Sequence, residues 1–141
     1  MAADLHNAPI FLGPDGPSAA DLATCVHCGC CLSSCPTFRV TGLESESPRG
    51  RIYLISQLQQ GEMAYSEELA RHLDACLGCR TCEANCQSAV PYGRIIEGAR
   101  AELERVRRPT LKRRLARRAL TDVVANPGRV RALGALLRAA Q

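Results

Sequence analysis

Eight of the nine cysteines in this 141-residue chain fall into two copies of one spacing, C-x2-C-x2-C-x3-C. The first copy consists of Cys25, Cys28, Cys31 and Cys35, and the second consists of Cys76, Cys79, Cys82 and Cys86. Each copy places three thiols within seven residues and a fourth thiol four residues further on. This is the ligand spacing of [4Fe–4S] clusters, and the chemistry that it predicts is electron transfer.

The fourth cysteine of each copy is predicted to bind across to the other site. In two-cluster ferredoxins this cysteine ligates the cluster whose other three ligands lie in the second motif. Applied to this chain, the rule assigns Cys25, Cys28, Cys31 and Cys86 to cluster 1, and Cys76, Cys79, Cys82 and Cys35 to cluster 2. The predicted cofactors are two [4Fe–4S] clusters, with all eight cysteines as metal ligands. This crossed pairing would hold the two motifs together.

Other uses of the cysteines fit the spacing less well. Tetrahedral zinc needs two C-x2-C pairs per ion and would leave the third cysteine of each motif over. Disulfides suit small secreted domains, but no signal-peptide pattern precedes the motifs and the cysteine count is odd. Attached haem c requires C-x-x-C-H, and Gly29, Arg80 and Glu83 stand where that histidine is needed.

Four other residues in the motifs have open roles. Cys30 fits neither copy, and we expect its side chain to point away from the loop as a small buried hydrophobe. A replacement ligand or a redox-sensitive thiol is the alternative for Cys30. His27 either tunes a cluster by hydrogen bonding or faces solvent. Gly29 and Gly78 fit tight turns or a close approach of backbone N–H groups to sulfur.

Capping residues and apolar spacing predict helices and hardly any strands. Residues 1–19 are predicted to form an irregular arm rich in Pro and Gly, and a short helix is expected to begin near Ser18. Ser47 is a good N-cap with Pro48 in the first turn, and Gly61 ends that helix.

Two further helices are predicted on either side of the second motif. Ser66 caps the first of them, in which Glu67 and Glu68 lie at the positive end of the helix dipole. The second is indicated by helical spacing of apolar residues over 95–106 and is expected to stop at Pro109.

The predicted fold class is all-α. Residues 20–108 are predicted to form an α-helical ferredoxin domain with two [4Fe–4S] clusters, because the 40 residues between the motifs have a helical pattern. Residues 109–141 are predicted to form a basic tail of two amphipathic helices separated by a turn at Asn126-Pro127-Gly128. The small core is expected to depend on its metal, so removing iron should leave residues 20–90 largely unfolded.

Charge divides the chain into two parts of opposite sign. Residues 1–99 carry 6 Lys+Arg against 11 Asp+Glu, a formal −5, whereas residues 100–141 carry 12 against 3, a formal +9. The apolar stripes of the tail are expected to dock on a partner. An anionic membrane surface and a plain solvated helix face are the alternatives. Nucleic acid is disfavoured because the tail holds no aromatic residue for stacking.

The compartment predicted for this chain is the cytoplasm. No apolar run reaches the ~18 residues that a membrane-spanning helix requires. Eight cysteines that must bind metal as thiolates also favour a reducing compartment, where disulfides do not compete. Peripheral contact with the inner face of the membrane stays open.

Three segments resemble the iron–sulfur subunit of glycolate oxidase. They are Cys25-Val26-His27-Cys28-Gly29, Ser47-Pro48-Arg49-Gly50-Arg51-Ile52-Tyr53-Leu54-Ile55, and Cys76-Leu77-Gly78-Cys79-Arg80-Thr81-Cys82 with Val90-Pro91-Tyr92. Relatives in this family act on lactate and on glycerol 3-phosphate. The resemblance covers about residues 20–135. The cysteine spacing alone would fit any dicluster ferredoxin, and the Ser-Pro-Arg-Gly-Arg-Ile segment is what points to this family.

The resemblance implies a non-catalytic electron-transfer subunit, with no substrate chemistry and no catalytic residue on this polypeptide. In such complexes a flavin-containing subunit oxidises a 2-hydroxy acid, and the clusters pass single electrons towards the quinone pool. Family members continue into cysteine-rich C-terminal domains, so a fragment or a second, cysteine-rich subunit is expected. The alternatives are a stand-alone dicluster ferredoxin serving other reductases and, after it, a structural metal module that binds nucleic acid.

Three residues near the motifs complete the expectations. Gln87 departs from the resemblance, which usually has Pro there, and we expect cluster binding to survive. Arg49 and Arg51 are expected to pair with Glu44 and Glu46 as ordinary structural arginines. An approach of either arginine to a cluster is the alternative.

Overall fold

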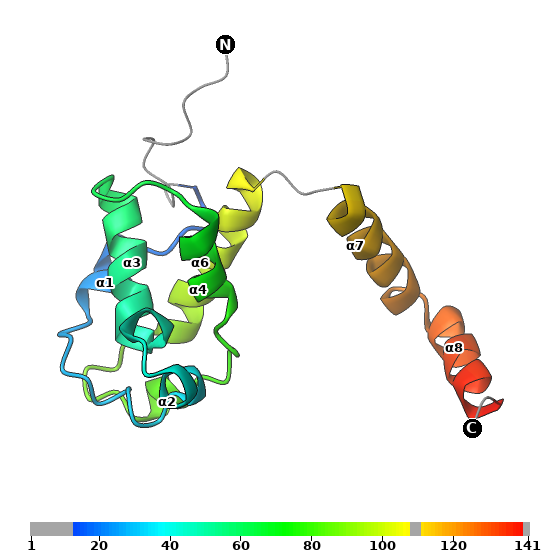
Figure 1. Cartoon of the computed structure of the whole chain (residues 1–141), viewed down its shortest axis with the longest axis horizontal. Helices are drawn as coiled ribbons and strands as arrows, with labels where there is room; N and C mark the ends of the chain where they lie inside the picture. Colours follow the sequence, from blue (N-terminus) through cyan, green and yellow to red (C-terminus); the bar gives the residue numbers. More distant parts are fainter. Residues whose placement is uncertain (1–12, 108–110, 140–141) are drawn as a thin grey trace, which may run out of the picture. The chain divides into compact units, whose positions relative to one another are not determined.

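The computed structural model describes residues 13–107 and 111–139 (Figure 1). Within these residues the chain contains helices and no strand, which confirms the predicted all-α fold. The chain divides into two compact units, residues 1–106 and 107–141. None of the described helices is both long and apolar enough to cross a membrane.

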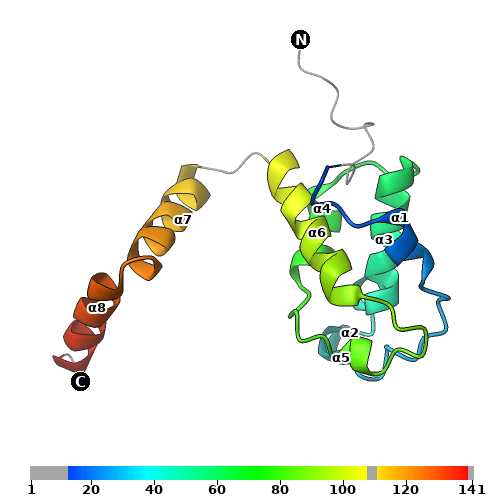
Figure 2. The ribbon, with the colours of Figure 1, turned by 180° about the vertical axis from the view of Figure 1, so that it is seen from behind.

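The first unit places its cysteine motifs in loops at one end of a small helical bundle. Its elements are α1 (Ala19–Ala23), α2 (Pro36–Thr41), the 3-10 turn η1 (Glu44–Glu46), α3 (Pro48–Gln60), α4 (Glu67–Asp74), α5 (Thr81–Ala84) and α6 (Tyr92–Val106). Helix α3 packs against α1, α4 and α6, and α4 also packs against α6. Figures 1 and 2 show the loops before α2 and around α5 at the same end of these helices.

Local signals placed the two central helices correctly. The Ser47 hydroxyl accepts a hydrogen bond from the N–H of Gly50 at 3.0 Å, and α3 ends at Gly61 in the left-handed conformation. The Ser66 hydroxyl caps α4 through the N–H of Leu69 at 3.1 Å. Both caps confirm the sequence prediction.

The edges of the other elements differ from the prediction in detail. Helix α1 follows Ser18 as expected, and residues 13–18 of the predicted arm lack regular structure, whereas residues 1–12 lie outside the described part. Helix α6 begins at Tyr92, before the apolar repeat starts, and the predicted stop at Pro109 also lies outside the described residues. The short helices α2 and α5 were not predicted.

The hydrophobic core joins the helices to the cysteine loops. Its members from α3, α4 and α6 are Ile52, Ile55, Leu58, Leu69, Ala70, Leu73, Tyr92, Ile95, Ile96, Ala99 and Leu103. Cys82 belongs to the same core, and Cys25, Cys31, Cys76 and Cys86 pack against it. The motifs therefore extend the core, and the helices fix their position.

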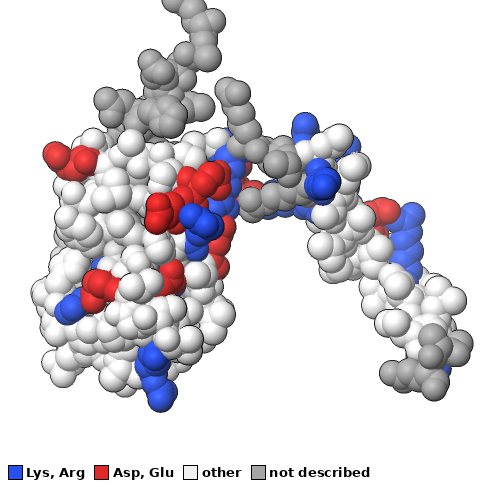
Figure 3. Space-filling view, viewed as in Figure 1, with Lys and Arg blue, Asp and Glu red and all other residues white. Residues whose placement is uncertain are grey.

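The second unit consists of α7 (Leu111–Val124) and α8 (Pro127–Ala139). The break between them is narrower than predicted, because Pro127 and Gly128 form the first turn of α8. The side-chain oxygen of Asn126 caps this turn by accepting from the N–H of Gly128 at 3.1 Å. Leu115 and Leu120 are more than half exposed, and Figure 3 shows Lys and Arg side chains along both helices.

Candidate metal centre

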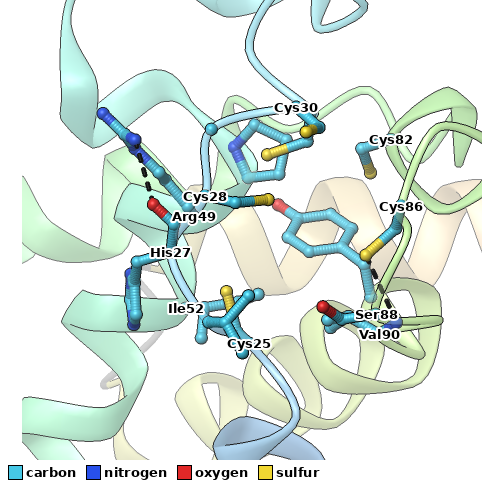
Figure 4. Close-up of a pocket in the computed structure, with 15 residues that line it drawn as sticks. Cys25, His27, Cys28, Cys30, Arg49, Ile52, Cys82, Cys86, Ser88 and Val90 are labelled. Atoms are coloured by element: carbon cyan, nitrogen blue, oxygen red, sulfur yellow. Dashed lines mark hydrogen bonds between the residues drawn. The ribbon is translucent and has the colours of Figure 1, made fainter.

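The eight motif cysteines line two adjoining cavities in the first unit. Cavity 1, about 420 Å³ including its open mouth, is lined by Cys25, Cys28, Cys31 and Cys86. Cavity 2, about 300 Å³ on the same measure, is lined by Cys35, Cys76, Cys79 and Cys82. Cys82 also reaches cavity 1. Figure 4 shows the sulfur atoms of Cys25, Cys28 and Cys86 facing a common space.

The grouping of the cysteines is compatible with the crossed pairing, which stays a prediction. Cys86 of the second motif lies with the first three cysteines of the first motif, and Cys35 lies with the first three of the second. All nine cysteines are free thiols. Among the described residues no three His, Cys, Asp or Glu side chains are grouped to hold a single ion. The motif thiols around each cavity fit the four ligands of a [4Fe–4S] cluster, and their ligation is a prediction.

The two cysteine loops have the same backbone shape although their sequences differ. Each has a left-handed residue two positions after the first cysteine, His27 (φ 54°) and Gly78 (φ 66°). Each has another directly after the second cysteine, Gly29 (φ 85°) and Arg80 (φ 56°). Both glycines therefore occupy turns that favour glycine, and the N–H of Gly78 also lies 3.5 Å from the sulfur of Cys76.

Side-chain hydroxyl groups contact three sulfur atoms of cavity 2. Oγ1 of Thr37 lies 3.2 Å from Sγ of Cys35, and the Thr81 hydroxyl donates to Sγ of Cys79 at 3.5 Å. The hydroxyl of Tyr92 donates to Sγ of Cys76 at 3.6 Å. Because burial raises the pKa of Tyr92, this hydroxyl keeps its proton. These donors stabilise negative charge on sulfur.

The thiols differ in how readily they ionise. Burial raises the pKa of Cys82 to about 12 and also raises the pKa of Cys31. Hydrogen bonds from the N–H of Cys30 lower the pKa of Cys28, and those from Thr81 lower the pKa of Cys79. Metal binds the thiolate, so coordination by the buried thiols must displace their protons.

Cys30 does not behave as predicted. It is exposed and lines cavity 1, so the expectation of a buried side chain pointing away from the loop is wrong. Its N–H and thiol interact with Cys28. His27 is also exposed and lines the same cavity. The adjacent Cys30-Cys31 pair was the only sequence signal for this position.

Arg49 pairs with Glu44, as predicted. Its Nε and Nη2 lie 2.5 and 3.2 Å from the two oxygens of that carboxylate, and Nη1 donates to the carbonyl of His27 at 3.2 Å. This ion pair lowers the pKa of Glu44. Arg49 also lines cavity 1. It can therefore lie near a cluster in that cavity while it stays paired with Glu44.

Arg51 lies at the centre of a buried network beside cavity 2. It has no exposed surface and donates to the Glu46 carboxylate at 2.5 Å, as predicted. It also donates to the carbonyl of Glu46 at 2.7 Å, the carbonyl of His72 at 2.7 Å and the hydroxyl of Thr37 at 3.1 Å. The second oxygen of Glu46 lies 2.6 Å from Nδ1 of His72. Sequence reasoning missed Thr37 and His72, because no local pattern links them to Arg51.

Comparisons with known proteins agree with this geometry. Residues 21–90 match the family described as "4Fe-4S dicluster domain". The chain is 44% identical over 113 residues to the glycolate oxidase iron-sulfur subunit of Escherichia coli (strain K12), covering 79% of this chain and 27% of that protein. It is 38% identical over 119 residues to the probable glycolate oxidase iron-sulfur subunit of Bacillus subtilis (strain 168), covering 83% and 27%.

A more distant relative is a subunit of the ferredoxin/F(420)H(2)-dependent CoB-CoM heterodisulfide reductase of Methanosarcina acetivorans. It is 33% identical over 71 residues, which is 50% of this chain and 39% of that protein. The chain spans about a quarter of the length of the two glycolate oxidase subunits. No solved structure was found to match it.

Proposed function

We propose that the chain binds two [4Fe–4S] clusters, because residues 21–90 match the 4Fe–4S dicluster domain family and the chain is similar to glycolate oxidase iron–sulfur subunits. We propose that it takes electrons from a flavin-containing 2-hydroxy-acid dehydrogenase and passes them towards quinone. The gathering of the motif cysteines around the two cavities carries this proposal. Each cluster, when bound, supplies transfer of one electron at a time. The residues of the chain hold the clusters and set their surroundings.

The first test is the metal content of anaerobically prepared protein. About eight iron and eight acid-labile sulfide per chain are expected, with two interacting EPR signals after reduction. Zinc in place of iron, with no EPR signal, would overturn the proposal.

The crossed pairing has its own test in two double variants. C25S/C86S removes two thiols from cavity 1 and leaves cavity 2 intact, so about four iron should remain. C25S/C35S removes one thiol from each cavity and should disturb both clusters. Uncrossed ligation predicts the opposite result for the two variants.

The second unit is proposed to dock on the partner polypeptide. Helices α7 and α8 expose leucine side chains, with Leu115 at 56% and Leu120 at 64%, next to basic residues. A surface of this kind fits a protein partner with an apolar and acidic face. Replacing both leucines with Glu should abolish co-purification with a flavoprotein and leave the iron content unchanged. Tyr53→Glu, at an exposed position of α3, is the control and should keep the complex.

We assign the protein to the reducing cytoplasm, because its thiols must stay reduced until they bind metal. The partner is sought by anaerobic purification from the native host, with flavin measured in the eluted complex. A monomer without flavin that still exchanges electrons would favour a stand-alone ferredoxin over a dehydrogenase subunit.

A further inference from the structure

The two cavities differ in the hydrogen-bond donors that face their sulfur atoms. A main-chain N–H group donates to sulfur in both: Val90 donates to Cys86 of cavity 1, and Gly78 donates to Cys76 of cavity 2. Hydroxyl groups are not shared in this way. Thr37, Thr81 and Tyr92 all contact sulfurs of cavity 2. Ser88 and Tyr92 also line cavity 1, but within the described part of the chain no hydroxyl donates to a sulfur of that cavity.

Thr37 also connects a buried cation to sulfur. Its Oγ1 accepts from Nη1 of Arg51 at 3.1 Å and lies 3.2 Å from Sγ of Cys35. The same hydroxyl lies 2.7 Å from the Glu46 carbonyl, but Arg51 donates to that carbonyl as well. When Cys35 is a thiolate it can only accept, so the single proton of the Thr37 hydroxyl is divided between that sulfur and the Glu46 carbonyl.

The arginines beside the two cavities do not cancel the difference in hydroxyl groups. Arg49, beside cavity 1, is 30% exposed at its side chain and is paired with Glu44. Arg51, beside cavity 2, is fully buried and is paired with Glu46. Arg80, which also lines cavity 2, is paired with Glu83. Every arginine beside the two cavities is therefore paired with a glutamate, and the hydroxyl groups are the difference between the sites that single substitutions can remove.

We propose that Thr37, Thr81 and Tyr92 give cluster 2, in cavity 2, a higher reduction potential than cluster 1. This inference rests on the proposed function, because it requires both clusters to be bound. Hydrogen bonds to sulfur stabilise the reduced cluster, which carries one more negative charge than the oxidised one. With both clusters bound, this order of potentials would favour transfer of one electron from cluster 1 to cluster 2, with no proton transfer or bond change.

The test is a potentiometric titration followed by EPR on Thr37→Val, Tyr92→Phe and the double variant. Each lost hydroxyl should lower the ratio of reduced to oxidised cluster 2 by about threefold at fixed potential. The double variant should lower it by about tenfold, which is 59 mV for one electron. Cluster 1 should not shift. The C25S/C86S protein, which keeps only cavity 2 intact, identifies which signal belongs to cluster 2.

Two controls separate hydrogen bonding from structural damage. Thr37→Ser keeps the hydroxyl and should leave the reduction potential of cluster 2 as in the unsubstituted protein. Tyr53→Phe removes an exposed hydroxyl of α3 and should change neither cluster's potential. Fewer than about eight iron in the unsubstituted protein would refute the proposed function. Eight iron with cluster 2 at the lower potential, or with no shift in the variants, would refute the inference alone.

Discussion

Replacing Arg51 with Met should destabilise the first unit far more than the same change at Arg49. Both arginines lie on α3 and each pairs with a glutamate at 2.5 Å, so their local sequence and ion pairs are matched. They differ in burial. The Arg51 side chain is 0% exposed and that of Glu46 is 11% exposed, whereas Arg49 and Glu44 are 30% and 49% exposed.

The expected magnitudes follow from this difference. Arg51→Met leaves the Glu46 carboxylate buried with only His72 beside it, and it removes four hydrogen bonds from the guanidinium. Removing one member of a buried pair costs about 3–5 kcal/mol. Arg49→Met removes an exposed pair, which costs about 0–1 kcal/mol. For a unit of this size, 3 kcal/mol lowers Tm by at least about 12 °C.

The assay is anaerobic unfolding of the iron-loaded protein, followed by far-UV circular dichroism with iron content measured in parallel. The double variant Glu46→Gln with Arg51→Met should recover part of the loss, because it no longer buries an unpaired carboxylate. If the free energies of unfolding of the Arg51→Met and Arg49→Met variants differ by less than about 1 kcal/mol, the buried network does not contribute the stability inferred for it.

Three further predictions concern metal, thiols and backbone. Chelating iron should leave residues 20–90 largely unfolded, and an iron-free form with native helicity by circular dichroism would contradict this. Alkylation of the iron-loaded protein should modify about one thiol per chain, Cys30, as read by peptide mass spectrometry; modification of a motif cysteine would show that it is not a ligand. Gly50→Ala should cost about 1–3 kcal/mol, because a Cβ there overlaps the Glu44 carbonyl. A Cβ added at Gly134 in α8 has no atom within 4 Å, so Gly134→Ala should stabilise that helix. If both substitutions change the free energy of urea unfolding equally, the overlap at Gly50 is not what destabilises the protein.

Features specified by nearby residues were predictable from the sequence. The caps at Ser47 and Ser66 depend on hydroxyls that reach amides three residues away. Helices α2 and α5 were missed because six and four residues are too short to show a helical repeat. The left-handed turns at His27 and Arg80 were missed because glycine is the usual sign of that conformation.

The surroundings of the cysteines were less predictable than the cysteines themselves. Spacing alone selected eight of the nine cysteines that line the two cavities. The partners of Arg51 lie as far as 21 residues away along the chain, and only the packing of α3 against α4 and η1 brings them together. Tyr92 stood out only as part of a resembling segment, with no sign that its hydroxyl reaches Cys76.

The sharing of cysteines between the two loops also orders events during synthesis. Cavity 1 is lined by Cys86, and cavity 2 needs Cys82, so neither set of four thiols exists until most of the first unit has left the ribosome. In the proposed crossed ligation, the first motif emerges about fifty residues earlier and lacks its fourth ligand until the second motif follows. The two sets are then completed within four residues of each other. Both proposed sites therefore become complete almost together, late in the synthesis of the first unit.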